Sequence, residues 1–132
     1  MRFTIYGRPE PQGSTRSFVR NGKIATTSDN KKLKPWRQQL SDTVFVESGC
    51  CPYVGKGLEP ITLTLDFYFQ RPKSAPKKRT ANTVKPDVDK LARACLDALT
   101  GIVYQDDAQV VAVTARKHYG LPERCEIEVI EV

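Results

Sequence analysis

Apolar and polar side chains alternate without interruption along residues 61–70, ITLTLDFYFQ, and this pattern limits the folds open to the chain. An alternation of period two sends successive side chains to opposite faces of a β-strand. One face of this strand therefore meets a hydrophobic core, and the other meets water. Such a strand needs a covering layer on its apolar face, which predicts a sheet with helices packed against it.

Two segments have the spacing of helices that can form this layer. Between residues 34 and 48, apolar side chains recur every three or four positions, and Pro35 suits the first turn of a helix. Between Val88 and Thr100 the apolar residues again share one face, and Gly101 is well placed to end the helix. We predict one helix over each segment.

Three more strands complete the predicted order. Residues 2–6 alternate and stop at Gly7, and residues 109–119 and 125–132 alternate on either side of a turn. The order is then β-α-β-α-β-β. At 132 residues the chain has the length of a single domain. The predicted fold class is α/β (α+β), with two helices packed on a mixed sheet.

Positive charge is concentrated in two segments. The chain has 21 Lys and Arg against 15 Asp and Glu, a net charge of +6 that favours an acidic partner such as nucleic acid. Residues 8–32 combine Pro, Gly and Ser with cations, and residues 71–85 contain six cations and no anion. We expect both to be irregular, DNA-contacting loops, the first gaining order only against its partner, although residues 71–85 could be merely a solvated loop. The candidate DNA-binding residues are Arg8, Arg16, Arg20, Lys23, Arg71, Lys73, Lys77, Lys78, Arg79 and Lys85.

Two pairs of aspartates flank the helix predicted over residues 88–100. Asp87 and Asp89 stand at its start, and Asp106 and Asp107 follow its end. Each pair alone has an ordinary explanation, because aspartates are favoured at helix starts and in turns. Together, inside a basic chain, they indicate a divalent metal site that faces a polyanion.

The two pairs can meet only if the chain returns after the helix. A helix of about 12 residues covers roughly 18 Å at 1.5 Å per residue, and the segment from Ile102 to Gln105 gives enough extended chain to come back. Three carboxylates in one small volume would need a cation or basic side chains nearby. Arg93, four residues after Asp89, and the adjacent Lys90 can supply that charge or form a structural salt bridge.

Other chemistries fit the sequence less well. An EF-hand loop would need an oxygen ligand at Leu91 and a glycine at Ala92, and a Gly-rich phosphate loop and a G-x-S-x-G motif are missing. The four cysteines lack C-x-x-C spacing and are expected to be reduced thiols. His118 is expected at the surface, and Asp66 is a weaker candidate for an auxiliary ligand. The sequence shows neither a secretory signal nor a transmembrane run, so we expect a cytoplasmic protein without membrane partners.

Three segments resemble the RusA family of crossover junction endodeoxyribonucleases, the Holliday junction resolvases often carried by phages and prophages. PDVDKL, LDALTG and DDAQVV occur in the family's order and at close to its spacing. The resemblance is strong over about Lys85 to Lys117 and elsewhere concerns only the order of elements. It implies that residues 1–132 form a single RusA-like domain, which acts as a homodimer on four-way DNA. It also implies two symmetric nicks made with Mg²⁺ or Mn²⁺ and without a small-molecule organic cofactor.

By residue, the resemblance assigns the three catalytic aspartates of the family to Asp87, Asp89 and Asp107. Asp106 is a neighbouring candidate ligand. The family's catalytic lysine falls on Arg93, and Lys90 stands where many members have asparagine, so both departures keep or add positive charge. The expected function is a metal-dependent junction resolvase. A nuclease for other branched DNA, such as flaps or forks, and a non-catalytic DNA-binding protein are the alternatives.

Overall fold

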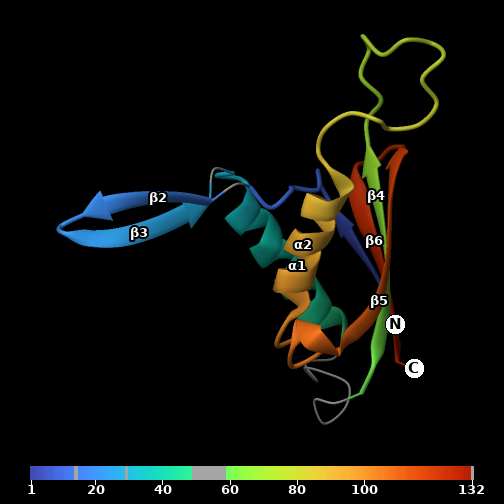
Figure 1. Cartoon of the computed structure of the whole chain (residues 1–132). Coiled ribbons are helices and arrows are strands. Elements are labelled where there is room, and N and C mark those ends of the chain that lie inside the picture. The colour runs from blue at the N-terminus through green and yellow to red at the C-terminus, as the bar shows by residue number, and fades with distance from the viewer. Residues whose placement is uncertain (14, 29, 49–58, 132) are drawn as a thin grey trace.

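The computed structural model describes residues 1–13, 15–28, 30–48 and 59–131 (Figure 1). Both predicted helices and all four predicted strands are present. No helix in these ranges is long and apolar enough to cross a lipid bilayer. In chain order the elements are β1 (Arg2–Tyr6), β2 (Thr15–Arg20), β3 (Lys23–Ser28), α1 (Leu33–Glu47), β4 (Ile61–Phe69), α2 (Val88–Leu99), the 3-10 helix η1 (Asp107–Gln109), β5 (Val110–Tyr119) and β6 (Arg124–Glu131).

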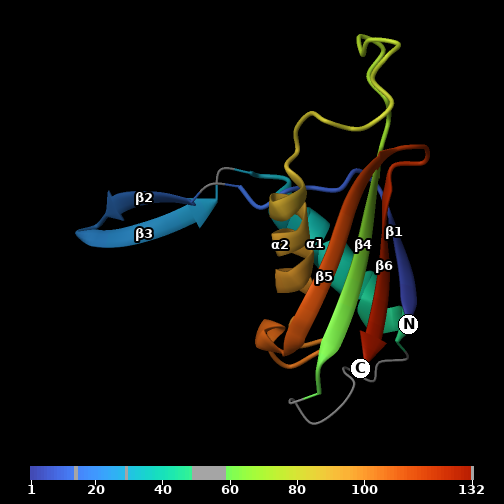
Figure 2. The same cartoon turned by 45° about the vertical axis from the view of Figure 1, so that its right-hand side comes forward.

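Four of the strands form one mixed sheet in the order β1-β6-β4-β5. β6 runs antiparallel to β1 and β4, whereas β5 runs parallel to β4. The parallel pair requires a crossover, and α2 supplies it by carrying the chain from the end of β4 back to the start of β5. Both helices lie on the same face of the sheet (Figure 2). This arrangement confirms the predicted single-domain α+β class.

The core lies between the sheet and the two helices. The odd-numbered side chains of β4, from Ile61 to Phe69, are all buried, and the even-numbered ones are partly exposed, as the alternation predicts. Burial of apolar area is the main stabilising contribution, and it holds α2 in place against the sheet. The helices contribute buried side chains at the predicted spacing, among them Trp36, Leu40 and Val44 from α1 and Leu91, Cys95 and Leu99 from α2.

Two of the four cysteines lie in this core. Cys95 and Cys125 are free thiols, as predicted, and their sulfur atoms are 4.0 Å apart. Burial raises the pKa of the Cys125 thiol well above its usual range, so this thiol stays protonated. Cys50 and Cys51 lie outside the described residues.

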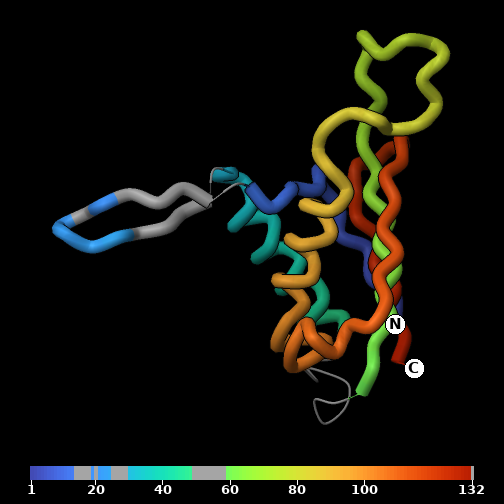
Figure 3. The backbone as a smooth tube through the Cα atoms, in the orientation of Figure 1, coloured from blue at the N-terminus to red at the C-terminus, as the bar shows by residue number. Residues whose placement is uncertain are grey.

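The expectation of an irregular loop over residues 8–32 is wrong. β2 and β3 pair as an antiparallel hairpin that projects away from the sheet and the helices (Figure 1), and its tip at residues 21–24 lies far from both (Figure 3). Asn21 and Gly22 form its turn with φ values of 53° and 73°, and two successive positive values suit a two-residue type I′ turn. The element order therefore gains a hairpin between β1 and α1. We call this hairpin, residues 15–28, the arm.

Candidate functional site

The first pair of candidate carboxylates lies at the N-terminal end of α2. Asp87 directly precedes the helix with an extended backbone, and its side chain makes no hydrogen bond that caps the helix. Asp89 lies in the first turn, and both residues are exposed. The Asp87 carboxylate is therefore not used to cap the helix, and its oxygen atoms can coordinate a cation. The positive end of the helix dipole also favours negative charge here.

Two lysines lie beside this pair. Lys90 forms a salt bridge with Asp87, with Nζ 3.6 Å from Oδ2. Lys117 on β5 donates from Nζ to the backbone carbonyl of Val84 at 2.6 Å and to that of Pro86 at 2.9 Å. Hydrogen bonds from a charged donor are stronger than neutral ones, so Lys117 ties the segment that leads into α2 to the sheet. It was not among the predicted site residues.

The chain that leads into the arm packs against the same end of α2. The backbone N–H of Gln12 donates to the carbonyl of Lys90 at 3.0 Å. A cavity of about 320 Å³ lies between these segments, and Lys85 and Asp87 line it together with Arg8 and residues 10–13. A ligand in this cavity would touch both the segment that leads into the arm and Asp87 of the acidic pair.

The second pair of carboxylates lies at the other end of α2. The Asp106 side chain accepts a hydrogen bond from the N–H of Ala108 at 2.9 Å, and the Gln109 side chain accepts one from the N–H of Asp106 at 3.1 Å. Asp107 is exposed. Its pKa is raised, because its carboxyl shares a hydrogen bond with the Asp106 side chain and lies near the charges of Asp106 and Asp97. The turn thus accounts for Asp106, whereas the crowding of Asp107 with like charges favours a bound cation.

A single chain does not bring the two pairs together. After α2, the N–H of Gly101 donates to the carbonyl of Tyr104 at 2.7 Å, and the Tyr104 hydroxyl donates to the carbonyl of Leu96 at 2.8 Å. This tight turn sends the chain into β5 about 18 Å from the start of α2, at 1.5 Å per helical residue. Within the four described ranges, no three His, Cys, Asp or Glu residues are grouped so that they could hold a metal ion. The return of the chain toward Asp87 therefore does not occur within one copy.

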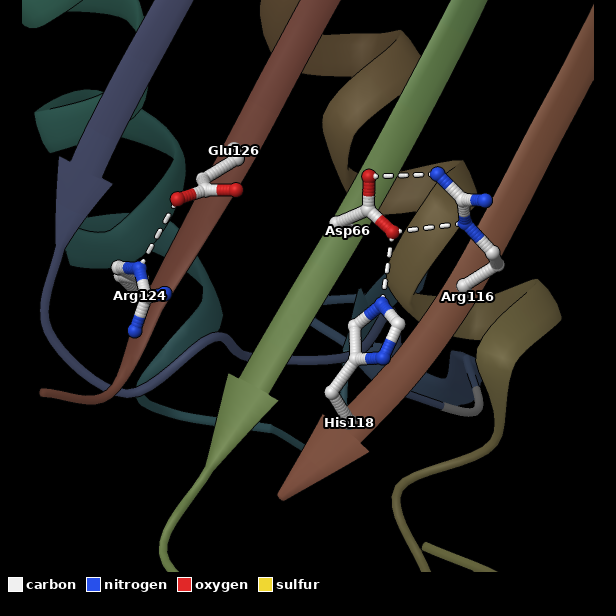
Figure 4. Close-up of polar contacts among 5 residues, drawn as sticks. All are labelled: Asp66, Arg116, His118, Arg124 and Glu126. Carbon is white, nitrogen blue, oxygen red and sulfur yellow. Dashed lines mark hydrogen bonds and ion pairs between the residues drawn. The ribbon is translucent and has the colours of Figure 1, made fainter. Parts of the chain in front are cut away.

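Asp66 and His118 belong to a separate cluster on the face of the sheet opposite the helices (Figure 4). Asp66 accepts hydrogen bonds from Arg116 at 2.8 and 3.1 Å and pairs with Nε2 of His118 at 2.7 Å. His118 also stacks on Tyr68, with ring centroids 4.7 Å apart. His118 lies at the surface, as expected, with its side chain 34% exposed, and it is paired with Asp66. Asp66 is held by basic partners on β5, away from the acidic pair at α2.

This cluster predicts a loss of stability in acid. Burial alone would raise the pKa of Asp66, but hydrogen bonds and charges from Arg116 and His118 outweigh it and hold the pKa below its ordinary value of 3.8. Unfolding removes those partners, so the ion pair stabilises the fold above the ordinary pKa and loses its contribution as the pH falls through the lower folded value. We expect Asp66→Asn to lower the melting temperature at pH 7. We also expect the melting temperature of this variant to fall less between pH 7 and pH 3 than that of the wild type. Circular dichroism melts at both pH values measure this, and equal decreases in the two proteins would contradict it.

Some of the predicted DNA-binding cations pair with other groups of the protein, and others are exposed to solvent. Arg8 forms a salt bridge with Glu123 at 3.0 Å, and Arg71 donates to the carbonyl of Pro76 at 2.5 Å. The side chains of Arg16 and Arg20, which lie on β2, fall outside the part of the chain that is described. The exposed members are Lys23, Lys73, Lys77, Lys78 and Lys85, and Arg79 is partly exposed.

A further group of cations was not among the predicted site residues. Lys31, Lys34 and Arg37, at the start of α1, line a cavity of about 770 Å³ that reaches α2 at Asp97. The signal was present in the sequence as a run of cations that continues past residue 32. Three cations around one hollow beside the base of the arm offer further contacts for phosphate groups.

The chain is similar to proteins of one known family. The family model described as Endodeoxyribonuclease RusA matches residues 7–130. The protein named "Uncharacterized protein YqaN" from Bacillus subtilis (strain 168) is 32% identical over 142 residues, which cover all of this chain and 96% of that protein. The family match includes both ends of α2, and therefore both aspartate pairs.

Proposed function

Because the chain belongs to the RusA family of endodeoxyribonucleases, whose members act on branched DNA, we propose that it resolves Holliday junctions by paired, symmetric, metal-dependent nicks. The observation that carries this proposal is the pair of exposed carboxylates, Asp87 and Asp89, in a strongly cationic chain. Phosphodiester hydrolysis needs this combination, since carboxylates can hold a hard cation and basic side chains can hold phosphates.

The donor atoms at α2 suit Mg²⁺ or Mn²⁺, which prefer oxygen ligands. We assign Asp87, Asp89 and Asp107 to the metal. Asp106 is the less direct candidate, because its side chain already caps η1. A bound divalent cation would neutralise charge on the scissile phosphate and lower the pKa of the attacking water.

The remaining roles fall to basic side chains near the first carboxylate pair. Lys90 lies 3.6 Å from Asp87, and Arg93 is exposed one helical turn beyond Asp89. Both can face the phosphate, where fixed positive charge stabilises the transition state. Lys117 acts differently: its hydrogen bonds hold the backbone that leads into α2, so we treat it as a positioning residue.

The cationic loop of residues 71–85 is proposed to hold DNA through its phosphates. Lys77 and Lys78 are both exposed in this loop. We expect the double variant Lys77→Ala/Lys78→Ala to weaken junction binding on every sequence and to reduce the slope of log affinity against log salt concentration by about 2. Fluorescence anisotropy of a labelled junction at several salt concentrations measures the slope. Arg2→Ala, at the salt bridge with Glu128, is the control, and an unchanged slope in the double variant would remove the loop from the DNA surface.

The arm supports a preference for branched DNA. Val19 and Ile24 pair across the hairpin next to its turn, and their side chains are 73% and 79% exposed. Apolar side chains at the tip of a projecting hairpin suit the unstacked bases of a branch point better than the outside of a continuous duplex. The same features would serve a nuclease for flaps or forks, so the substrate must be chosen by experiment.

Cleavage of defined substrates tests the proposed function. Purified protein is incubated with an end-labelled mobile four-way junction, or with linear duplex of the same sequence, in the presence of Mg²⁺ or EDTA. We expect paired, ligatable nicks in the junction when Mg²⁺ is present and none in EDTA. We expect no product from the duplex. Cleavage of flaps or forks in preference to junctions would assign the protein to other branched DNA. Binding without product on every substrate, with Mg²⁺ and with Mn²⁺, would leave a non-catalytic DNA-binding protein.

A further inference from the structure

Two hollows of the surface meet at the base of the arm, where α1 also begins (Figure 1). The cavity of about 320 Å³ that Asp87 lines is called the carboxylate hollow. The cavity of about 770 Å³ that the cations at the start of α1 line is called the cationic hollow. Gln12 and Asn30 line both cavities, so the two hollows are neighbours that share a wall.

The shared wall is built by the segments through which the chain enters and leaves the arm. Nδ2 of Asn30 donates to the carbonyl of Pro11 at 2.9 Å and to the carboxylate of Glu10 at 3.2 Å. The backbone N–H of Gln12 donates to the carbonyl of Lys90 in α2 at 3.0 Å. These bonds join the two segments to each other and to α2, so a ligand that spans both hollows meets a preformed surface.

The neutral polar groups of the cationic hollow already bind other groups of the protein. The hydroxyls of Ser41 and Thr100 each donate to a carbonyl of α2 at 2.9 Å, and the Gln38 amide donates to Asp42 at 2.8 Å. The three cations differ, because within the described ranges their side chains make no ion pair and no hydrogen bond. The hollow therefore offers charged donors that the described residues do not engage. The residues that supply them are Lys31, Lys34 and Arg37.

Arg37 is the most informative of these cations. It is partly buried, and Asp97 lines the same hollow but forms no ion pair with it. Arg8, Arg116 and Arg124, by contrast, each have a nitrogen atom within 3.1 Å of a carboxylate oxygen. A guanidinium group that is partly withdrawn from water and lacks a carboxylate partner suits a phosphate, which its parallel N–H donors can bind through two oxygens.

The charge and size of the cationic hollow suit a short section of a nucleic-acid strand. Its described lining carries three cations and one carboxylate, so an anion is favoured there. Its volume of about 770 Å³ lies within the roughly 300–1,000 Å³ of sites that hold small molecules. Phosphates repeat along a strand, so a strand whose scissile phosphate lies in the carboxylate hollow presents further phosphates at the adjoining hollow.

We propose that Lys31, Lys34 and Arg37 hold the cleaved strand by phosphates that lie within about three nucleotides of the cut, which span roughly 10 Å of duplex axis at about 3.4 Å each. This inference rests on the proposed function, because it takes Asp87 as a ligand of the metal at the scissile phosphate. The strand crosses the base of the arm between the two hollows. Contacts on this side of the cut orient the scissile phosphate against the carboxylates.

Neutral replacements of single phosphates test these contacts one at a time. The probes are fluorescent four-way junctions that each carry one methylphosphonate, and binding is measured in EDTA so that no strand is cut. We expect wild-type affinity to fall about tenfold for one or two replacements near the cut, because a charge-assisted hydrogen bond is lost. Arg37→Gln should bind the unmodified junction about tenfold more weakly and lose nothing further at those positions. Cleavage of the unmodified junction by the wild type, with Mg²⁺, marks the cut.

Lys32→Gln is the matched control for the loss of one positive charge. Lys32 is exposed and adjoins Lys31, but the described lining of the cationic hollow does not include it. We expect Lys32→Gln to keep the wild-type response to every methylphosphonate. Melting temperatures of both variants should match that of the wild type, since within the described ranges neither side chain bonds to another group of the protein.

Three results would overturn the proposed path of the strand. The first is a loss of affinity in Arg37→Gln no greater than in Lys32→Gln. The second is an Arg37→Gln variant that responds to every methylphosphonate as the wild type does. The third is a coupled phosphate more than about three nucleotides from the cut. Coupled phosphates in a protein whose wild-type form cuts no DNA, with Mg²⁺ or with Mn²⁺, would support the phosphate site and count against the proposed function instead.

Discussion

Asp107→Asn is expected to abolish junction cleavage, with a loss on the order of 10³-fold or more, while junction binding stays unchanged or becomes tighter. The substitution removes a charged ligand from the proposed metal site and keeps the size of the side chain. Asp106 and Asp97 crowd this carboxyl and raise its pKa, so removing its charge relieves repulsion and leaves the fold intact. Single-turnover cleavage at saturating protein separates the chemical step from binding.

Asp106→Asn is the matched control for this experiment. Asparagine caps helices about as well as aspartate, so the bond to the N–H of Ala108 and the turn before β5 are kept. We expect most of the cleavage activity to remain. A loss equal to that of Asp107→Asn would make both carboxylates ligands, and a wild-type rate in Asp107→Asn would remove that residue from the mechanism.

The elements that the sequence predicts are those whose side chains pack into the core. Burial imposes a period on the apolar residues, which is two along residues 61–70 and close to 3.6 in the two helices. The boundaries follow from the same cause, since α1 buries Trp36, Leu40 and Val44 on one face and ends once no further apolar residue continues that stripe. Local sequence is sufficient in these places because each element meets the same layer of apolar side chains.

The arm could not be predicted from such a period, because it does not pack on the core. Val19 and Ile24 face water, so they do not belong to a buried stripe. The Pro, Gly and Ser residues around the hairpin are also typical of loops. The local signal was the dipeptide Asn21-Gly22, which favours a two-residue hairpin turn regardless of burial. This dipeptide indicates the hairpin more strongly than the loop-like composition argues against it.

The candidate site shows a similar division between local and long-range information. The acidic pair at the start of α2 follows from the chain itself, because Asp87 and Asp89 adjoin a well-marked helix. The position of Asp107 depends instead on the turn after α2, where Tyr104 bonds back to the helix. Lys117 contacts the backbone before α2 across sequence separations of 33 positions to Val84 and 31 positions to Pro86. Its acceptors are backbone carbonyls, which every residue has, so the sequence does not indicate this contact.

Lys117→Met is expected to lower the cleavage rate at saturating DNA by about 10- to 100-fold, because misplacing a catalytic group by about 1 Å can cost that much. Methionine keeps an apolar stem on β5 but cannot donate to the carbonyls of Val84 and Pro86. The backbone that leads into Asp87 is then no longer tied to the sheet. Steady-state cleavage of a labelled junction should show a fall in kcat with little change in KM. The Mg²⁺ concentration that gives the half-maximal rate should rise.

Lys117→Arg separates positioning from a general loss of structure. Arginine keeps the charge and the donors, so we expect it to restore part of the cleavage rate and part of the Mg²⁺ dependence. Lys78→Met, on the exposed loop, should weaken DNA binding and leave kcat unchanged. Melting temperatures and size-exclusion profiles show whether each variant stays folded and keeps its association state. If Lys117→Met were destabilised but cut at the wild-type rate, with the same Mg²⁺ dependence, its hydrogen bonds would support only the fold, and the placement of Asp87 would have to come from the packing of α2 alone.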